Sequence, residues 1–326
     1  EDLEENDRVS AAGARRAITH YLIVDEEYDA NGRITTKDFY QAFTNALSRH
    51  QTATEIQEFV SKLEGYTDTY LDIHECTIRD YRRGDREQIS GYMRFFQRKN
   101  AHAPILLLFL VENIEDTDRM LELLRSAIKL HIRLILQNAN PAYRRDSFYQ
   151  LVGELKQTKK DEWVDKTEDY IKKRTVSDPE LQETIKTVEL PNSAFTRDLL
   201  RLLEEEYYTA GKPETKLDPE SIELEHIAPK RSFGAKKYSS WEAVFDNNEE
   251  KFDTYKSRIG NLTLLAKSQN IRASNSSYSD KKEIYTESEI EMTSQIPVNY
   301  DEWGFEEIEK RSKQMSKDIV NMWGIK

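Results

Sequence analysis

One histidine of this sequence lies among residue types that together could hydrolyse a phosphodiester. His226 follows Glu225 in the stretch ELEHIAPKRSFG, and Asn261 and Asn270 come later in the chain. A neutral imidazole, whose ordinary pKa is about 6.5, can take a proton from water near neutral pH. Phosphodiester hydrolysis needs such a base, together with a cation that stabilises the charge on the phosphorane and the leaving oxygen. These residues predict His226 as a general base.

The same set offers oxygen atoms for a cation. A hard divalent ion such as Mg²⁺ or Mn²⁺ keeps several waters and needs only one or two protein oxygens. Glu225 and Asn270 are the predicted metal ligands. Asn261 carries an amide that both donates and accepts, so it is predicted to bridge the loop that holds His226 and to fix its ring.

Each of these residues also has an ordinary structural interpretation. A histidine beside a turn is commonly structural or exposed to solvent. The alternation of SIELEHI makes Glu225 an ordinary strand residue, and Asn261 could pin a turn after Gly260. Asn270 could be a helix N-cap. These alternatives stay open on the sequence.

Basic residues near the candidate site predict contacts with DNA phosphates, because Lys and Arg neutralise phosphate charge. A run of charges is also commonly just a solvated face. The predicted contacts are Lys230, Arg231, Lys267, Arg272 and Lys281, with Lys236 and Lys237 as further candidates.

The net charge of −12 argues against a nucleic-acid partner until its distribution is considered. Residues 226–290 carry 11 Lys and Arg against 9 Asp and Glu, whereas residues 1–225 carry 32 against 44. The excess acid therefore lies outside the segment that begins at His226.

A strand, loop, strand and helix are the elements expected to position these side chains. SIELEHI (221–227) alternates like a strand, and RIGNLTLLA (258–266) is a second strand candidate. Between them lies a charged insertion that contains Trp241, and KSQNIRASN then begins a helix with polar caps. This order is that of a ββα-metal (HNH) finger.

The remainder of the chain is predicted to be helical. Apolar residues recur at spacings of three and four. The predicted helices cover 10–22, 36–63, 86–100, 103–114, 115–138 (capped near Asp116 or Thr117), 145–155, 162–174, 179–188, 193–208 and 301–325, with a loop at DEEYDANGRIT (25–35). We therefore expect a mainly α fold, with an N-terminal helical domain (1–208) followed by an α+β domain (209–326). The loop at 209–221, rich in Gly and Pro, is the predicted linker.

Several protein classes are excluded by composition. The longest apolar run, PILLLFLV, is far shorter than the roughly 20 residues that span a bilayer. The single Cys76 excludes an internal disulfide and a cysteine-based zinc cluster, so we expect a cytoplasmic protein. The chain begins at Glu1 without Met, which suggests a fragment.

From Ser221 onward the chain resembles the HNH-type, His-Me-finger nuclease domain at the C-terminus of GmrSD-type, SspE-like restriction and phage-defence proteins. The similar segments are EHIAP (225–229), IGNLTLL (259–265), NIRASNSSYSDKK (270–282) and a tail with Trp303, Ile308, Arg311 and Trp323. The segments PILLLFLVENI, IRLILQN and RDLLRLLEEEYYTAGK resemble the helical region that precedes this nuclease.

The resemblance implies that His226 is the general base, Asn270 a metal ligand and Asn261 the supporting polar residue. Many HNH nucleases have Asp before the base, whereas this chain has Glu225, whose side chain is one methylene longer. The family further implies restriction of foreign DNA and an N-terminal ParB-like, nucleotide-hydrolysing domain that is absent from this sequence.

Two functions are consistent with these observations. The first is a DNA endonuclease that nicks one strand per active site; a double-strand break would need a homo-oligomer with two sites, or rebinding. The second is a non-cleaving DNA-binding or assembly module of a larger defence protein. A purely structural helical scaffold is a third alternative, and it predicts neither cleavage nor DNA retention.

Overall fold

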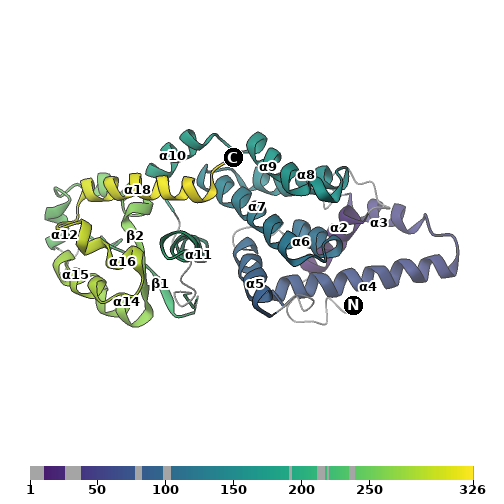
Figure 1. The fold of residues 1–326 in the computed structure, drawn as a ribbon, viewed down its shortest axis with the longest axis horizontal. Coiled ribbons are helices and arrows are strands. Elements are labelled where there is room, and N and C mark those ends of the chain that lie inside the picture. Colours follow the sequence, from purple (N-terminus) through teal and green to yellow (C-terminus); the bar gives the residue numbers. More distant parts are fainter. Residues whose placement is uncertain are drawn as a thin grey trace. The chain divides into compact units, whose positions relative to one another are not determined.

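A computed structural model describes residues 11–25, 38–77, 83–97, 104–190, 193–210, 217–218, 220–234 and 239–325 (Figure 1). The chain forms two compact units. Unit 1 comprises residues up to His131 together with Ala139–Arg174, and unit 2 comprises Ile132–Asn138 together with Thr175–Lys326. None of the helices in these described ranges is long and apolar enough to cross a membrane.

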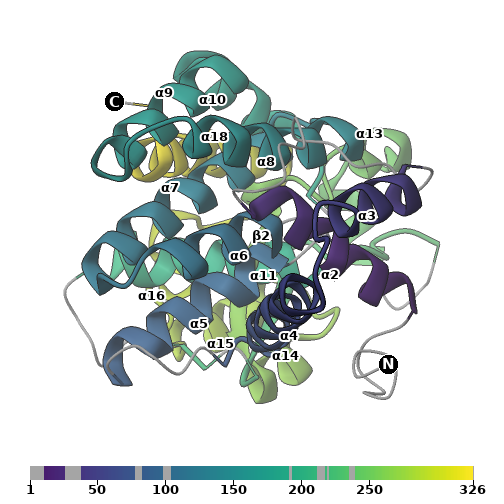
Figure 2. The ribbon, with the colours of Figure 1, turned by 90° about the vertical axis from the view of Figure 1, so that its right-hand side faces the viewer.

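Unit 1 is helical in the part that the structure describes. Its elements are α2 (Ala11–Val24), α3 (Phe39–Leu47), α4 (Ala53–Glu75), α5 (Arg83–Gln97), α6 (Pro104–Asn113), most of α7 (Thr117–Leu136), α8 (Pro141–Lys156), the 3-10 turn η1 (Lys160–Glu162) and α9 (Trp163–Arg174). Helices α2, α4 and α6 pack against one another (Figure 2). The residues of α6 from Pro104 to Leu110 are all buried.

The predicted helix 36–63 is wrong as a single element. The chain leaves α3 after Leu47 and starts α4 at a capping box, in which the Thr52 hydroxyl accepts from the Glu55 N–H and the Glu55 carboxylate accepts from the Thr52 N–H. A capping box satisfies N–H groups that have no partner within the helix, so it favours a new start there. The predicted loop at 25–35 lies, beyond Asp25, outside the described residues.

Unit 2 combines short helices with a small sheet. Its elements are the last turn of α7, α10 (Asp178–Thr187), α11 (Ala194–Leu203), the π-helix η2 (Glu204–Tyr208), β1 (Ile222–His226), α12 (Ser239–Val244), α13 (Glu249–Asp253), the 3-10 turn η5 (Ile259–Asn261), β2 (Leu262–Ala266), α14 (Lys267–Ala273), α15 (Tyr278–Thr286), α16 (Glu291–Ser294), α17 (Ile296–Asn299) and α18 (Phe305–Trp323). The mainly α class is confirmed.

The main segment of the second compact unit begins at Thr175, whereas the sequence placed the domain boundary at the loop 209–221. A buried arginine on the last turn of α7 provides one reason for the earlier start. Arg133 donates to the Thr175 hydroxyl (2.9 Å), to the Asp178 carboxylate (2.6 Å) and to the carbonyl of Trp323 at the end of α18 (3.2 Å). These bonds join α10 to α18 inside unit 2. Most of the predicted linker, residues 211–216 and Pro219, lies outside the described residues.

Strands β1 and β2 form an antiparallel pair among the described residues, followed directly by α14. Ile222 pairs with Ala266, and His226 pairs with Leu262 at the other end. Helix α14 packs against both strands (Figure 1). The predicted order of strand, loop, strand and helix is therefore present, and the insertion between the strands folds into α12 and α13.

The aromatic residues of the insertion build the core next to the sheet. Phe245 stacks on Trp241 and lies edge-on to Phe305 of α18. Further along α18, Ile308, Met315 and Ile319 are buried, as the amphipathic pattern predicts. Burying apolar surface of this kind is the main stabilising term for such a small sheet.

We predict that the absence of a side chain at Gly260 contributes to the stability of unit 2. A Cβ atom at this position would collide with the Ile308 carbonyl oxygen and the Ser312 hydroxyl of α18. We expect Gly260→Ala to lower the free energy of unfolding by about 1–3 kcal/mol, as for other overpacked sites. Urea denaturation measures this. The matched control is Gly153→Ala in α8, which meets no atom within 4 Å and should be neutral or stabilising. Equal stability of the two variants would contradict the prediction.

Candidate active site

His226 is the last residue of β1, and its imidazole ring is buried. The residue is 9% exposed, and its Nε2 atom makes no hydrogen bond to any residue that the structure describes. Burial, together with the positive charges of Lys230 and Lys281, lowers the pKa of His226 to about 3. The ring is therefore neutral at physiological pH, and it has a lone pair or an N–H group available for a ligand.

Asn261 fixes the loop that follows His226. Its buried amide oxygen accepts from the Ala228 N–H (2.8 Å), and its amide nitrogen donates to the Ala228 carbonyl (2.9 Å) and the Lys256 carbonyl (2.9 Å). Its own carbonyl accepts from the Ile227 N–H (3.0 Å). This main-chain bond continues the pairing of the two strands by one residue beyond His226 and Leu262.

Residues near the C-terminus hold Asn261 in turn. The indole N–H of Trp303 donates to the Asn261 amide oxygen (3.1 Å). Arg311 of α18 is buried and donates from Nη1 to the carbonyls of Gly260 (2.8 Å) and Leu262 (2.6 Å), which flank Asn261. The sequence analysis included Trp303 and Arg311 among the C-terminal residues similar to those of the family, but it predicted no role for either residue.

Glu225 and Lys281 form a buried ion pair behind the histidine. The Lys281 ammonium donates to the Glu225 carboxylate (2.6 Å), to the His226 carbonyl (2.9 Å) and to the Ile227 carbonyl (3.0 Å). Tyr285, one turn further along α15, donates to the same carboxylate oxygen (2.9 Å). Burial raises the pKa of Glu225. The positive charge of Lys281 acts in the opposite direction and lowers the pKa, but its effect is smaller.

This geometry corrects two sequence predictions. Lys281 is fully buried and its three donors are used, so the predicted phosphate contact is wrong for this residue. The Glu225 carboxylate is the counter-ion of Lys281, and this disfavours its predicted role as a metal ligand. The sequence signal for Tyr285 was its spacing of four from Lys281, which places both residues on one face of α15.

Asn270 lies inside α14, where a half-buried side chain makes no hydrogen bond to a described residue. The N-cap position of this helix is Ala266, so Asn270 is four residues past the cap and the N-cap interpretation is wrong. Because α14 packs against both strands, Asn270 is carried on an element adjacent to that of His226.

The remaining basic candidates are exposed on the surface of unit 2. Lys230, Arg231, Lys267 and Arg272 all face solvent. Arg272 pairs with Glu287 (2.9 Å), and partial burial lowers the pKa of the Lys230 ammonium, with a further effect of the Lys256 charge. Lys236 and Lys237 lie outside the described residues.

Comparison with known families identifies this part of the chain. Residues 175–318 match the family described as GmrSD restriction endonucleases, C-terminal domain. This part of the chain is therefore similar to the C-terminal domain of GmrSD restriction endonucleases. The match confirms the resemblance found in the sequence, and a restriction endonuclease domain implies DNA as its substrate. No curated protein matches the chain.

The donor atoms near His226 fit a hard, well-hydrated cation better than a metal held by several protein side chains. Among the described residues, no three His, Cys, Asp or Glu side chains form a metal-binding group. The His226 Nε2 atom, however, has no hydrogen-bond partner among the described residues, and neither does the half-buried Asn270 side chain. A cation that keeps most of its waters needs no more than one or two such atoms.

The buried His226 predicts a pH-dependent loss of stability. Its pKa falls from about 6.5 in the unfolded chain to about 3 in the folded protein, so only the unfolded state takes up a proton as the pH drops below 6.5. The resulting stability is complete above pH 6.5 and is lost toward pH 3. Between pH 7.5 and 5.0 we expect the parent to lose about 2 kcal/mol more unfolding free energy than His226→Asn.

Urea denaturation at the two pH values, with a chelator present, measures this difference. Comparing the parent with the variant cancels the contribution of every other titrating group. Parallel losses in the two proteins would show that His226 titrates normally in the folded state.

Proposed function

We propose that this protein is a metal-dependent DNA endonuclease in which His226 is the general base. The observation that carries the proposal is the buried neutral imidazole of His226. Its Nε2 atom has no partner within the described ranges, while its main chain is held through Asn261 and Lys281. A positioned base with an open nitrogen is what deprotonation of an attacking water requires. In this proposal Asn261 is a positioning residue that touches the loop and not the substrate.

The low pKa of His226 is consistent with this role once DNA is considered. Burial and the positive charges of Lys230 and Lys281 depress the pKa in the protein alone. A phosphodiester bound near Lys230 brings negative charge that opposes both effects, because an opposite charge favours the imidazolium. Binding of the substrate would therefore raise the basicity of His226 when it is needed.

Asn270 is the proposed ligand for the divalent cation, Mg²⁺ or Mn²⁺, with waters completing the coordination. When bound, this cation supplies charge stabilisation for the phosphorane and the leaving oxygen. Glu225 remains the counter-ion of Lys281 and keeps the end of β1 rigid. The exposed Lys230, Arg231, Lys267 and Arg272 are proposed to neutralise DNA phosphates.

A single site of this type cuts one strand per encounter, so the proposed product is a nick. The proposed biological role is restriction of foreign or phage DNA, together with a nucleotide-hydrolysing partner domain. Cutting both strands would then require two copies of the site or rebinding.

Removal of the base should abolish nicking. We expect the parent chain with Mg²⁺ or Mn²⁺ to convert supercoiled plasmid to the open circle, and His226→Ala to be slower by about 10²–10⁴-fold, the usual contribution of a general base. The measurement is the rate of open-circle formation on agarose gels. The matched control is His74→Ala, which removes an exposed histidine from α4 and should leave the rate unchanged.

Three results would contradict or redirect this proposal. An intact plasmid with the parent, or parental cleavage by His226→Ala, would exclude His226 as the base of a nuclease. Metal-independent retention of DNA that is lost in Lys230→Ala and Arg231→Ala, without cleavage, would instead support the non-cleaving binding module.

Loss of the proposed ligand should weaken the response to metal. We expect Asn270→Ala to raise the Mg²⁺ concentration for half-maximal nicking by about 10-fold or more, as for loss of other metal-site residues. Gln269→Ala, on the preceding half-buried position of α14, is the control and should keep the parental metal dependence. An unchanged Mg²⁺ titration for Asn270→Ala would remove Asn270 from the proposed site.

A further inference from the structure

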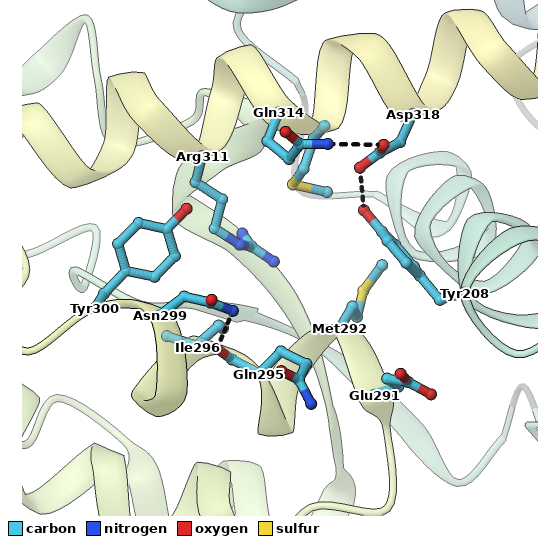
Figure 3. A pocket seen from close by; sticks show the side chains of 11 residues that line it. Tyr208, Glu291, Met292, Gln295, Ile296, Asn299, Tyr300, Arg311, Gln314 and Asp318 are labelled. Carbon is cyan, nitrogen blue, oxygen red and sulfur yellow. Dashed lines mark hydrogen bonds between the residues drawn. The ribbon is translucent and has the colours of Figure 1, made fainter.

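A cavity of about 250 Å³ in unit 2 lies outside the candidate active site. Its walls come from the π-helix η2, from α16 and α17, and from α18 (Figure 3). Ligand sites for drug-sized molecules have volumes of roughly 300–1,000 Å³, so this cavity matches a single ring system and not an extended ligand. We refer to it as the α18 cavity.

Arg311 contributes to the α18 cavity a guanidinium group whose hydrogen-bond donors are only partly used. The residue is buried, and no Asp or Glu forms an ion pair with it in the part of the chain that the structure describes. Among the described residues, its Nη1 atom alone donates hydrogen bonds, to Gly260 and Leu262, and Figure 3 shows the guanidinium directed into the cavity. The edge formed by Nε and Nη2 is thus left for an acceptor, and burying an unpaired charge is costly.

The remaining residues that line the cavity indicate which class of ligand could supply the acceptor atoms. Met292, Ile296 and Met315 supply an apolar lining, and Tyr208 and Tyr300 add aromatic rings. Methionine sulfur makes favourable contacts with aromatic rings, so this lining suits a flat heterocycle.

The acids beside the cavity argue against a phosphate. Asp318 already accepts from the Tyr208 hydroxyl (2.8 Å) and the Gln314 amide (3.0 Å), and Glu291 also lines the cavity. Two carboxylates would repel a multiply charged anion, whereas a neutral ring with acceptor atoms avoids this repulsion.

The α18 cavity is also held open by a separate buried carboxylate. Glu204, the first residue of η2, accepts from the N–H groups of Glu291 (2.6 Å) and Met292 (2.9 Å) at the start of α16. The same π-helix places Tyr208 in the cavity wall. π-Helical segments are rare and are found mostly at functional sites, and a preformed wall reduces the entropic cost of binding.

We propose that the α18 cavity binds one nucleobase of the guanine type, with its O6 and N7 acceptors toward the free edge of Arg311. Arginine pairs with these two atoms in the commonest specific contact to a base. Adenine presents a donor in place of O6 and fits this edge poorly. The base could belong to a free nucleotide or to an extruded nucleotide of DNA, and the chemistry is the same in both.

Nucleotides that differ at one position test the proposal directly. Isothermal titration of the full 326-residue chain, without metal, should show saturable binding of GMP and of IMP, which shares O6 and N7 with GMP. We expect AMP to bind at least tenfold more weakly and ribose 5-phosphate not to bind. AMP or ribose 5-phosphate binding as tightly as IMP would overturn the proposal, as would no binding of GMP at millimolar concentration.

Two neighbouring substitutions on α17 localise the binding. Asn299 is exposed at the rim of the cavity, whereas Val298 is 74% exposed and does not line it. Asn299→Trp should weaken GMP binding at least tenfold, while Val298→Trp should bind like the parent. Equal binding by the two variants would place the nucleotide elsewhere and overturn the assignment.

A competition experiment separates the two sources of the base. If the base comes from DNA, a single-stranded oligonucleotide with one guanine displaces GMP, and the same oligonucleotide with an abasic site does not. If neither displaces GMP, the ligand is a free nucleotide; equal displacement by both would overturn recognition of a base. These measurements need no cleavage, so their outcome is independent of the proposed nuclease activity.

Discussion

The candidate site depends on the hydrogen bonds of one buried amide. Asn261 is fully buried, and a buried amide is stable only when its donors and acceptors find partners. Its side chain contacts Ala228, Lys256 and Trp303, three residues that come from separate loops of unit 2. The Asn261 side chain therefore fixes the loop after His226 together with Lys281, which binds the His226 and Ile227 carbonyls.

Close packing against α18 makes this arrangement possible. The backbone of Gly260 lies directly on α18, and its N–H donates to the Ser312 hydroxyl (3.1 Å). Arg311, one residue earlier, takes the carbonyls on both sides of Asn261. The terminal helix thus determines the shape of the 3-10 turn η5, and through that turn the end of β1. If the α18 cavity binds a base at Arg311, the same side chain would connect that ligand to the candidate active site.

Buried charge is used here for positioning more than for stability. Removing Lys281 and Glu225 from water costs free energy that their attraction offsets only when further hydrogen bonds are made. Both residues make them, to the carbonyls of His226 and Ile227 and to the hydroxyl of Tyr285. The same dry surroundings keep the imidazole neutral, so the network that fixes the histidine also controls its protonation.

The order of the elements and the residues of interest around His226 could be predicted from the sequence, because period-2 alternation and short motifs are local properties. It also predicted the mainly α class and most helices, since helical periodicity is local too. The burial of Lys281 beside Glu225 and the place of Asn270 past the helix cap became visible in the folded chain and not before.

The tertiary structure likewise brought Trp303 and Arg311 to Asn261 and placed the start of the second unit at Thr175. These features depend on contacts between residues more than 40 positions apart, as in the bonds from Trp303 and Arg311 to the segment around Asn261. Whether a lysine faces solvent or a buried carboxylate is decided by which distant surface packs over it. No local pattern of residue types carries that information.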